Sequence, residues 1–140
     1  MSYGKPTDHY LIQRIQSASP EQLVAILLEG GQRYLGQAIK AIETKNYRLQ
    51  ASSLSRVGEF IVELALHLNL EGGSELAHTL NEMYDYWTLE LFEASQTRDL
   101  VRLEALSRMM GDLRATWEEL HVQKLRSAPS PEFLTGDRVV

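Results

Sequence analysis

Four long segments of this chain repeat apolar residues every three or four positions, the spacing that places them on one face of an α-helix. They run over about 19–44, 46–68, 74–96 and 99–124. No segment alternates apolar and polar residues as a half-buried β-strand does. Because the links between the four are short, neighbouring helices must run antiparallel. The sequence therefore predicts an all-α fold, an antiparallel up-down four-helix bundle.

Capping residues mark where these helices begin. Ser19, Pro20 and Gln22 form a capping box with proline at the first helical position. Ser74 is the predicted N-cap of the third helix and follows the Gly72-Gly73 pair that closes the preceding connection. These signals predict sharp helix starts at both places.

One apolar stripe on each helix is the predicted core. The four stripes, in chain order, are Leu23, Leu27, Gly30, Tyr34, Ala38 and Ala41; Leu54, Val57, Ile61, Leu64 and Leu68; Leu76, Leu80, Met83, Trp87 and Leu91; and Leu103, Leu106, Met110, Leu113, Trp117 and Leu120. A chain of 140 residues is expected to form a single core. We therefore predict one bundle domain over residues 1–126, including a short N-terminal helical cap segment, 1–18, packed on the bundle. The proline-containing residues 127–140 are predicted to be a disordered, mobile tail.

Composition argues against several classes of function. The chain has no cysteine, which excludes disulfides and thiolate chemistry and fits a cytoplasmic, reducing compartment. A net charge of −5 with scattered basic residues opposes binding to nucleic acid. No apolar run is long enough to cross a bilayer or to serve as a signal peptide. The sequence thus predicts a cytoplasmic protein without nucleic acid or membrane insertion.

A second apolar stripe on the first long helix points to an interface. With Leu23 and Leu27 facing the core, Leu28, Leu35 and Ile39 fall well to one side of them at about 100° per residue. Val24 and Ile42 lie on the shoulder of this stripe. Val62 and Leu66 point away from the core stripe of the second helix in the same way. A contiguous exposed apolar patch of this kind usually marks a binding surface.

The same stripe can also be buried within the monomer, in either of two ways. The N-terminal segment can cover it, or the bundle can be rotated so that both faces of the helix touch neighbouring helices. Cover by the N-terminal segment is compatible with binding if Tyr10 and Ile15 occupy the patch in the free protein and yield it to a partner. Tyr84 and Tyr86 flank the third core stripe, where a ring can bury its body and leave its hydroxyl in water, so either can contact a partner.

Metal-dependent catalysis is the sharpest alternative to binding. Glu75 with His78 and Glu118 with His121 both have the Glu-x-x-His spacing found in di-metal bundles. Their helical phase points them away from the core stripes, and the other two helices lack matching glutamates. No phosphate loop, serine elbow or buried acid pair is recognisable in the sequence. We therefore predict no enzyme activity, no metal and no cofactor.

The chain resembles FliS, the flagellin-specific export chaperone family of the flagellar secretion system. The matching residues are Tyr10, Ser17-Ala-Ser-Pro-Glu-Gln-Leu23, Glu29-Gly30, Glu63-Leu64, Gly72-Gly73, Leu80, Met83-Tyr84-Asp85-Tyr86 and Trp117. The resemblance covers about residues 10–120. It implies an antiparallel helical bundle whose leading segment covers part of the flagellin-binding surface.

The resemblance implies a cytoplasmic chaperone that binds the disordered C-terminal region of flagellin. Such a chaperone prevents premature polymerisation and assists delivery to the type III export gate, a component of which is a further partner. The alternative from another class is a self-associating structural bundle, a homodimer whose seam is the outer stripe. The predicted partner-binding residues are Tyr10, Ile15, Leu28, Leu35, Ile39, Val62, Leu66, Tyr84 and Tyr86.

Overall fold

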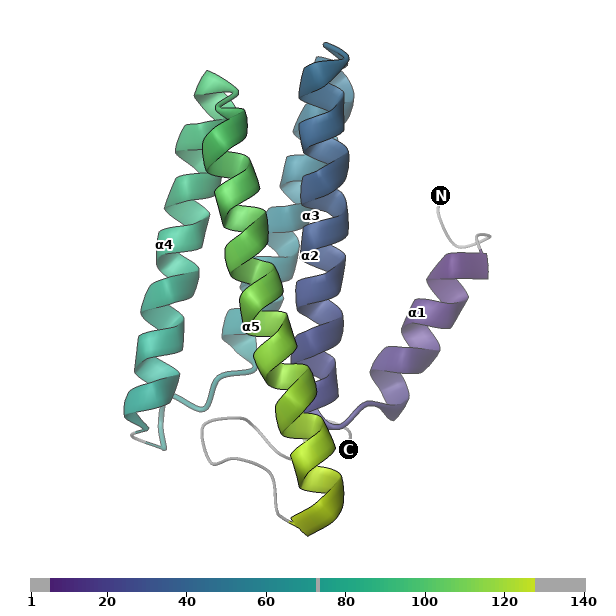
Figure 1. The fold of residues 1–140 in the computed structure, drawn as a ribbon, viewed down its shortest axis with the longest axis vertical. Coiled ribbons are helices and arrows are strands. Elements are labelled where there is room, and N and C mark those ends of the chain that lie inside the picture. The colour runs from purple at the N-terminus through teal and green to yellow at the C-terminus, as the bar shows by residue number, and fades with distance from the viewer. Residues whose placement is uncertain (1–5, 73, 128–140) are drawn as a thin grey trace.

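The computed structural model describes residues 6–72 and 74–127, and within them every element is a helix (Figure 1). The helices are α1 (Pro6–Ser17), α2 (Pro20–Glu43), α3 (Tyr47–Leu66), α4 (Glu75–Thr97) and α5 (Leu100–Ser127). The all-α prediction is confirmed, and α2 to α5 form the antiparallel bundle. Of the predicted tail, Ser127 ends α5, and residues 128–140 lie outside the described residues. No described helix combines the length and the apolarity needed to cross a membrane.

Helices α2 and α4 begin at the predicted caps, Ser19 and Ser74. The Ser19 hydroxyl accepts the backbone N–H of Gln22 at 3.1 Å, and the Ser19 N–H donates to the Gln22 side chain at 3.0 Å. Ser74 caps α4 by accepting the N–H of Ala77 at 3.3 Å. Asp99 does the same for Arg102 at 3.2 Å at the start of α5. Each cap satisfies an N–H that the first turn of a helix leaves without a partner.

The four bundle helices pack as a ring in which α2 lies between α3 and α5, and α4 closes the other side (Figure 1). The backbone of α2 approaches the backbones of α3 and α5 much more closely than α4 approaches its neighbours. The predicted stripes of α3 and α5 are confirmed, with Leu113 and Leu120 of α5 partly buried. The core is therefore built around α2.

On α4 the predicted core stripe is partly wrong. Leu76 is 47 % exposed, and Met83 is only partly buried. Ala77 and Tyr84 take their places in the core, beside Leu80, Trp87, Leu91 and Ala94. The helix is thus rotated by a fraction of a turn from the predicted orientation, which brings the Tyr84 ring against Trp87.

The outward orientation predicted for the second stripe of α2 is wrong. Leu28 and Leu35 are completely buried, Val24 and Ile42 are buried, and Ile39 is partly buried against the core. The reason is that α2 touches α3 on one side and α5 on the other, so it needs an apolar surface much wider than one stripe. The structure therefore supports a bundle rotated so that both faces of α2 touch neighbouring helices.

The N-terminal segment is helical, but it packs on the bundle only through its end. The backbone of α1 approaches that of α2 alone, and α1 leans away from the bundle toward its own start (Figure 1). Arg14 forms an ion pair with Glu29 at 3.3 Å, and Ile15 packs against the core. Tyr10, by contrast, is 63 % exposed. Of the two residues that could cover the apolar surface, Ile15 contacts the core in this structure and Tyr10 does not cover it.

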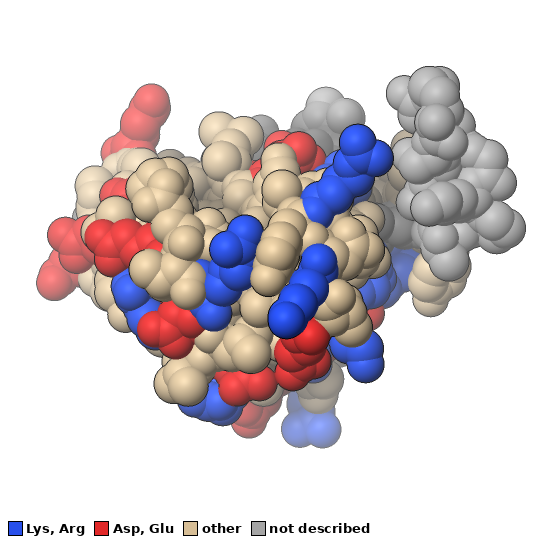
Figure 2. Space-filling model, turned by 90° about the horizontal axis from the view of Figure 1, so that it is seen from above, with Lys and Arg blue, Asp and Glu red and all other residues tan. Residues whose placement is uncertain are grey.

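Charge is distributed unevenly over the bundle. Helix α4 contains five acidic residues and no lysine or arginine, so its formal charge equals the −5 of the whole chain. Seen from above, acidic side chains gather at the left of the molecule, the side on which Figure 1 places α4 (Figure 2). The rest of the chain therefore carries balanced charges.

Two helix glycines are expected to respond oppositely to alanine. A Cβ at Gly30 would lie 2.5 Å from the Phe60 ring, whereas a Cβ at Gly58 would meet nothing within 4 Å. Gly30→Ala should lower the free energy of unfolding by about 1 to 3 kcal/mol, because the Phe60 ring or the two helices must shift to make room for the methyl group. Gly58→Ala should raise it by about 0.5 to 1 kcal/mol through helix propensity. Urea denaturation measures both, and equal effects at the two positions would contradict the close approach at Gly30.

Candidate partner-binding surfaces

The structure separates the nine predicted partner-binding residues into three groups. The exposed ones are Tyr10, Val62, Leu66 and Tyr86; the partly buried ones are Ile15 and Ile39; the buried ones are Leu28, Leu35 and Tyr84. They do not form one continuous surface, because Tyr10 and Ile15 belong to α1, Val62 and Leu66 to α3, and Tyr86 to α4. The prediction of a single stripe is therefore replaced by separate surfaces.

Tyr84 is part of the core and does not reach the surface. It is 2 % exposed, and its ring centroid lies 5.4 Å from that of Trp87 at an interplanar angle of 54°. Burial raises the pKa of the Tyr84 hydroxyl, so the group stays protonated at any physiological pH. The prediction placed both tyrosine hydroxyls in water. Of the two side chains only that of Tyr86 is exposed, at 51 %.

An apolar cavity lies where α1 meets α2 and α3. Its walls are Ile15 from α1, Leu23 and Leu27 from α2, and Phe60 from α3, and its volume is about 280 Å³. Leu23 and Leu27 have buried side chains whose edges form the floor. Ile15 is the α1 residue in this lining, so a displacement of α1 would widen the cavity. We refer to this site as the apolar cavity.

Polar side chains of α3 and of His67, the residue that follows it, form the rim of the apolar cavity. Arg56 pairs with Glu59 at 3.2 Å, and the His67 Nε2 lies 3.5 Å from a Glu63 oxygen. Leu66 is the neighbour of His67 in the chain, and Val62 lies one turn earlier on the outer side of α3. The exposed apolar side chains of α3 thus continue outward from the rim. A segment seated in the cavity can extend over them.

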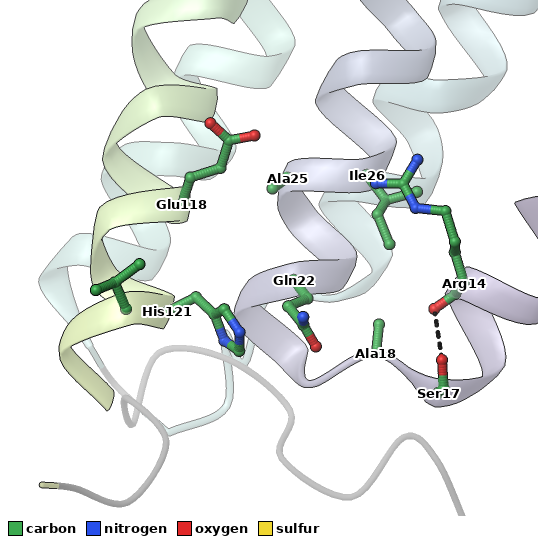
Figure 3. Close-up of a pocket in the computed structure, with 9 residues that line it drawn as sticks. Arg14, Ser17, Ala18, Gln22, Ala25, Ile26, Glu118 and His121 are labelled. Carbon is green, nitrogen blue, oxygen red and sulfur yellow. Dashed lines mark hydrogen bonds between the residues drawn. The ribbon is translucent and has the colours of Figure 1, made fainter. Parts of the chain in front are cut away.

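A second, more polar cavity lies between the end of α1, the start of α2 and the last turns of α5 (Figure 3). Its volume is about 380 Å³. Ala25 and Ile26 supply its apolar side, and Glu118 and His121 face it from α5. The Ser19 hydroxyl lies 3.4 Å from the His121 Nδ1. The two cavities lie on either side of the place where α1 joins α2.

The two Glu-x-x-His motifs do not meet. Glu75, His78 and Glu118 are exposed, and His121 is half-buried beside the polar cavity. In the described residues, no three histidine or acidic side chains are grouped so that they can hold a metal ion.

Two large apolar side chains on α4 were missed by the sequence reasoning. Leu89 is 55 % and Phe92 59 % exposed, and both lie on the same outer side of the helix as Tyr86. The signal that could have found them is that neither belongs to the core stripe of α4. A helix with apolar residues outside its core stripe has a second surface to account for.

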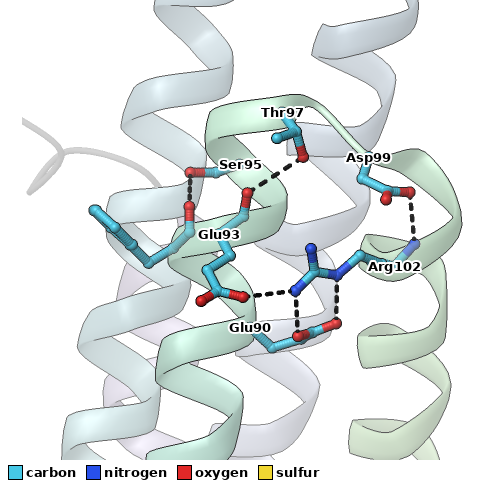
Figure 4. A network of polar contacts seen from close by, with 7 residues as sticks. Glu90, Glu93, Ser95, Thr97, Asp99 and Arg102 are labelled. Carbon is cyan, nitrogen blue, oxygen red and sulfur yellow. Dashed lines mark hydrogen bonds and ion pairs between the residues drawn. The ribbon is translucent and has the colours of Figure 1, made fainter.

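Arg102 of α5 fastens the last turns of α4 (Figure 4). Its guanidinium donates to both Glu90 oxygens at 2.8 and 2.6 Å and to Glu93 at 3.0 Å. These hydrogen bonds hold the pKa of the Glu90 carboxyl below its ordinary value of 4.5. A bidentate pair of this kind fixes geometry better than a single contact does.

The Glu90–Arg102 pair predicts a pH dependence of stability. Folding lowers the pKa of Glu90. The pair therefore contributes fully to the stability of the folded state when the pH is above 4.5, the pKa of Glu90 in the unfolded chain, and this contribution is lost as the pH falls through the lower pKa of the folded state. Glu90→Gln should therefore lower the melting temperature by a few degrees at pH 7, and the difference from wild type should vanish in acid. Scanning calorimetry from pH 7 to 3 measures this. Glu104→Gln, at an exposed position on α5, is the control. If the melting temperatures of Glu90→Gln and wild type differed by the same amount at every pH, the stabilising role of the Glu90–Arg102 pair would be contradicted.

The chain is similar in sequence to known flagellar proteins. The family model of the flagellar protein FliS matches residues 3–124. A flagellar secretion chaperone FliS of Bacillus subtilis is 26 % identical over 119 residues, covering 85 % of this chain and 88 % of the relative. The chaperone FliSB of Pseudomonas aeruginosa is 28 % identical over 105 residues, covering 75 % and 83 %. A FliS of Vibrio cholerae is 22 % identical over 107 residues, covering 76 % and 79 %.

Proposed function

Because the chain belongs to the FliS family of flagellar secretion chaperones, we propose that its client is flagellin, bound through the disordered C-terminal region. Binding in the cytoplasm keeps that region from polymerising, and the complex is delivered to the type III export gate. The function is binding rather than catalysis. The observation that carries the proposal is the apolar cavity, whose α1 wall is weakly attached.

The attachment of α1 supports displacement by a client. The Arg14–Glu29 ion pair has both side chains more than a third exposed, and such pairs contribute at most about 1 kcal/mol. Burial of Ile15 adds an apolar contact that a client side chain can replace in kind. A client segment that folds on binding spends about 2 to 5 kcal/mol on ordering, so it must bury apolar surface beyond the cavity itself. Val62 and Leu66 on α3 offer that surface.

The self-associating bundle is the alternative, and burial removes the α2 part of its predicted seam. It rested on an outer stripe of α2 that included Leu28 and Leu35, and both side chains are buried within the monomer. The client hypothesis also loses those two residues, but it retains the apolar cavity and the exposed side chains of α3. No observation favours the homodimer over it.

Co-expression with the flagellin of the same cell tests the proposal. The affinity-tagged chain should retain full-length flagellin and lose flagellin that lacks its C-terminal segment. A fusion of that segment to an unrelated soluble protein should be retained as well. Retention of flagellin independent of its C-terminal segment would contradict the proposal, and so would a chain that retains neither form.

Ile15 provides a test of the covering role of α1. Ile15→Ser should raise the affinity for the flagellin C-terminal segment by about two- to tenfold, because a larger fraction of the molecules has the cavity open. Ile12→Ser, at an exposed position of α1 outside the cavity wall, should leave the affinity unchanged. Titration calorimetry measures both. A loss of affinity on Ile15→Ser would mean that Ile15 holds the client and does not compete with it.

A further inference from the structure

The outer face of α4 carries an apolar stripe that the bundle leaves in solvent. Tyr86, Leu89 and Phe92 follow one another at intervals of three residues and are 51, 55 and 59 % exposed. One exposed apolar side chain needs no explanation, but three in successive turns on the same side of a helix form a continuous surface. None of the three lines a described cavity between helices.

Acidic side chains surround this stripe. Asp85 and Glu93 lie one turn before and after Leu89, Glu82 lies one turn before Tyr86, and all three acids are exposed. The helix has no basic residue of its own, and the Arg102 guanidinium from α5 is engaged by Glu90 and Glu93. Figure 4 shows this pairing at the last turns of α4. We call the surface formed by Glu82, Asp85, Tyr86, Leu89, Phe92 and Glu93 the acidic face.

The charge of the acidic face restricts what can cover it. A second copy of the chain using the same face would set the three acidic residues of one acidic face against the same three of the other. Anionic lipid surfaces and nucleic acid are repelled for the same reason. A partner with positive charge around an apolar stripe complements the surface in both respects.

We propose that the acidic face of α4 is a second docking site, which binds an amphipathic helix of another protein whose apolar stripe is flanked by lysine and arginine. Leu89 and Phe92 supply the central apolar contacts, and Glu82 and Asp85 select the positive flanks. The site shares no residue with the apolar cavity. It goes beyond the proposed function, and its test uses the chain without client.

The probe is a synthetic amphipathic helical peptide of leucine and lysine, with a leucine–glutamate peptide of the same pattern as its counterpart. The full-length chain should bind the lysine peptide and not the glutamate peptide. Leu89→Ser and Phe92→Ser should each raise the dissociation constant about tenfold, and the double variant Glu82→Lys/Asp85→Lys should raise it more. Raising the salt concentration should weaken binding to the wild type.

A matched control separates docking from general attraction of a cation to an acidic protein. Glu104→Lys/Glu119→Lys changes the net charge by the same amount on exposed positions of α5, and it should retain most of the affinity. Equal losses in the two double variants, or no effect of Leu89→Ser and Phe92→Ser, would overturn the proposal. Hydrogen exchange gives an independent readout, because the bound peptide should protect amides of α4, and protection confined to other helices would also overturn it. Circular dichroism confirms that each variant is folded before it is titrated.

Discussion

Leu28→Ala and Leu35→Ala are each expected to lower the free energy of unfolding by about 2 to 5 kcal/mol. Both side chains are completely buried, and they lie seven residues apart on the same side of α2, two turns along the helix. Alanine at either position leaves a cavity between α2 and its neighbours, and the close-packed side chains around it cannot move to fill it. A loss of this size is a large share of the roughly 5 to 15 kcal/mol that stabilises a typical domain. Urea denaturation followed by circular dichroism measures it.

Val62→Ala is the matched control for this prediction. Val62 is 58 % exposed on α3, so its truncation should change stability by no more than about 0.5 kcal/mol. If Leu28→Ala and Leu35→Ala behaved like Val62→Ala, the outward stripe predicted from the sequence would be restored. The comparison therefore decides whether α2 is the centre of the bundle or one of its outer helices.

The outward orientation predicted for Leu28 and Leu35 was wrong because α2 has neighbours on two sides. The pattern of α3 and α5 was sufficient because each buries one stripe, so the period alone identifies Val57 or Met110 as core. Helix α2 buries a much wider arc, and a single-stripe reading has to place part of that arc in solvent. The small residues Ala25, Gly30 and Gly31 within the helix indicate close neighbours, and Gly30 meets the Phe60 ring of α3. They were the available sign that α2 is surrounded.

The surfaces were harder to predict than the fold. The apolar cavity depends on the angle at which α1 leaves α2, and no residue pattern encodes that angle. Ile15 was predicted because its segment had apolar residues to bury, whereas Phe60 was not, since it lies beside the core stripe of α3. Leu66 was predicted because it points away from that stripe. Phe60 was therefore missed because it borders the core, whereas Leu89 and Phe92 were missed although they stand outside the core stripe of α4.

The largest expected effect on function concerns the outer side of α3. Val62 and Leu66 are 58 and 67 % exposed, lie one turn apart and continue from the rim of the apolar cavity. If the client segment seats one side chain in the cavity, its next turn has to pass over this side of α3. Full burial of each of the two side chains is worth about 1.5 to 3 kcal/mol, so together they supply several of the kilocalories that ordering the client consumes.

Val62→Asp/Leu66→Asp is therefore expected to weaken binding of the flagellin C-terminal segment by about 100-fold or more, because the apolar contacts are lost and two carboxylates lose water on binding. Titration calorimetry measures the affinity, and thermal unfolding should show a folded bundle since both positions are exposed. Val101→Asp, at a 73 % exposed position in the first turn of α5, introduces the same kind of change far along the chain from the cavity and should leave affinity unchanged. Unchanged affinity in the α3 double variant would place the client elsewhere on the bundle. Equal weakening by Val101→Asp would show that the client responds to net charge and not to this surface.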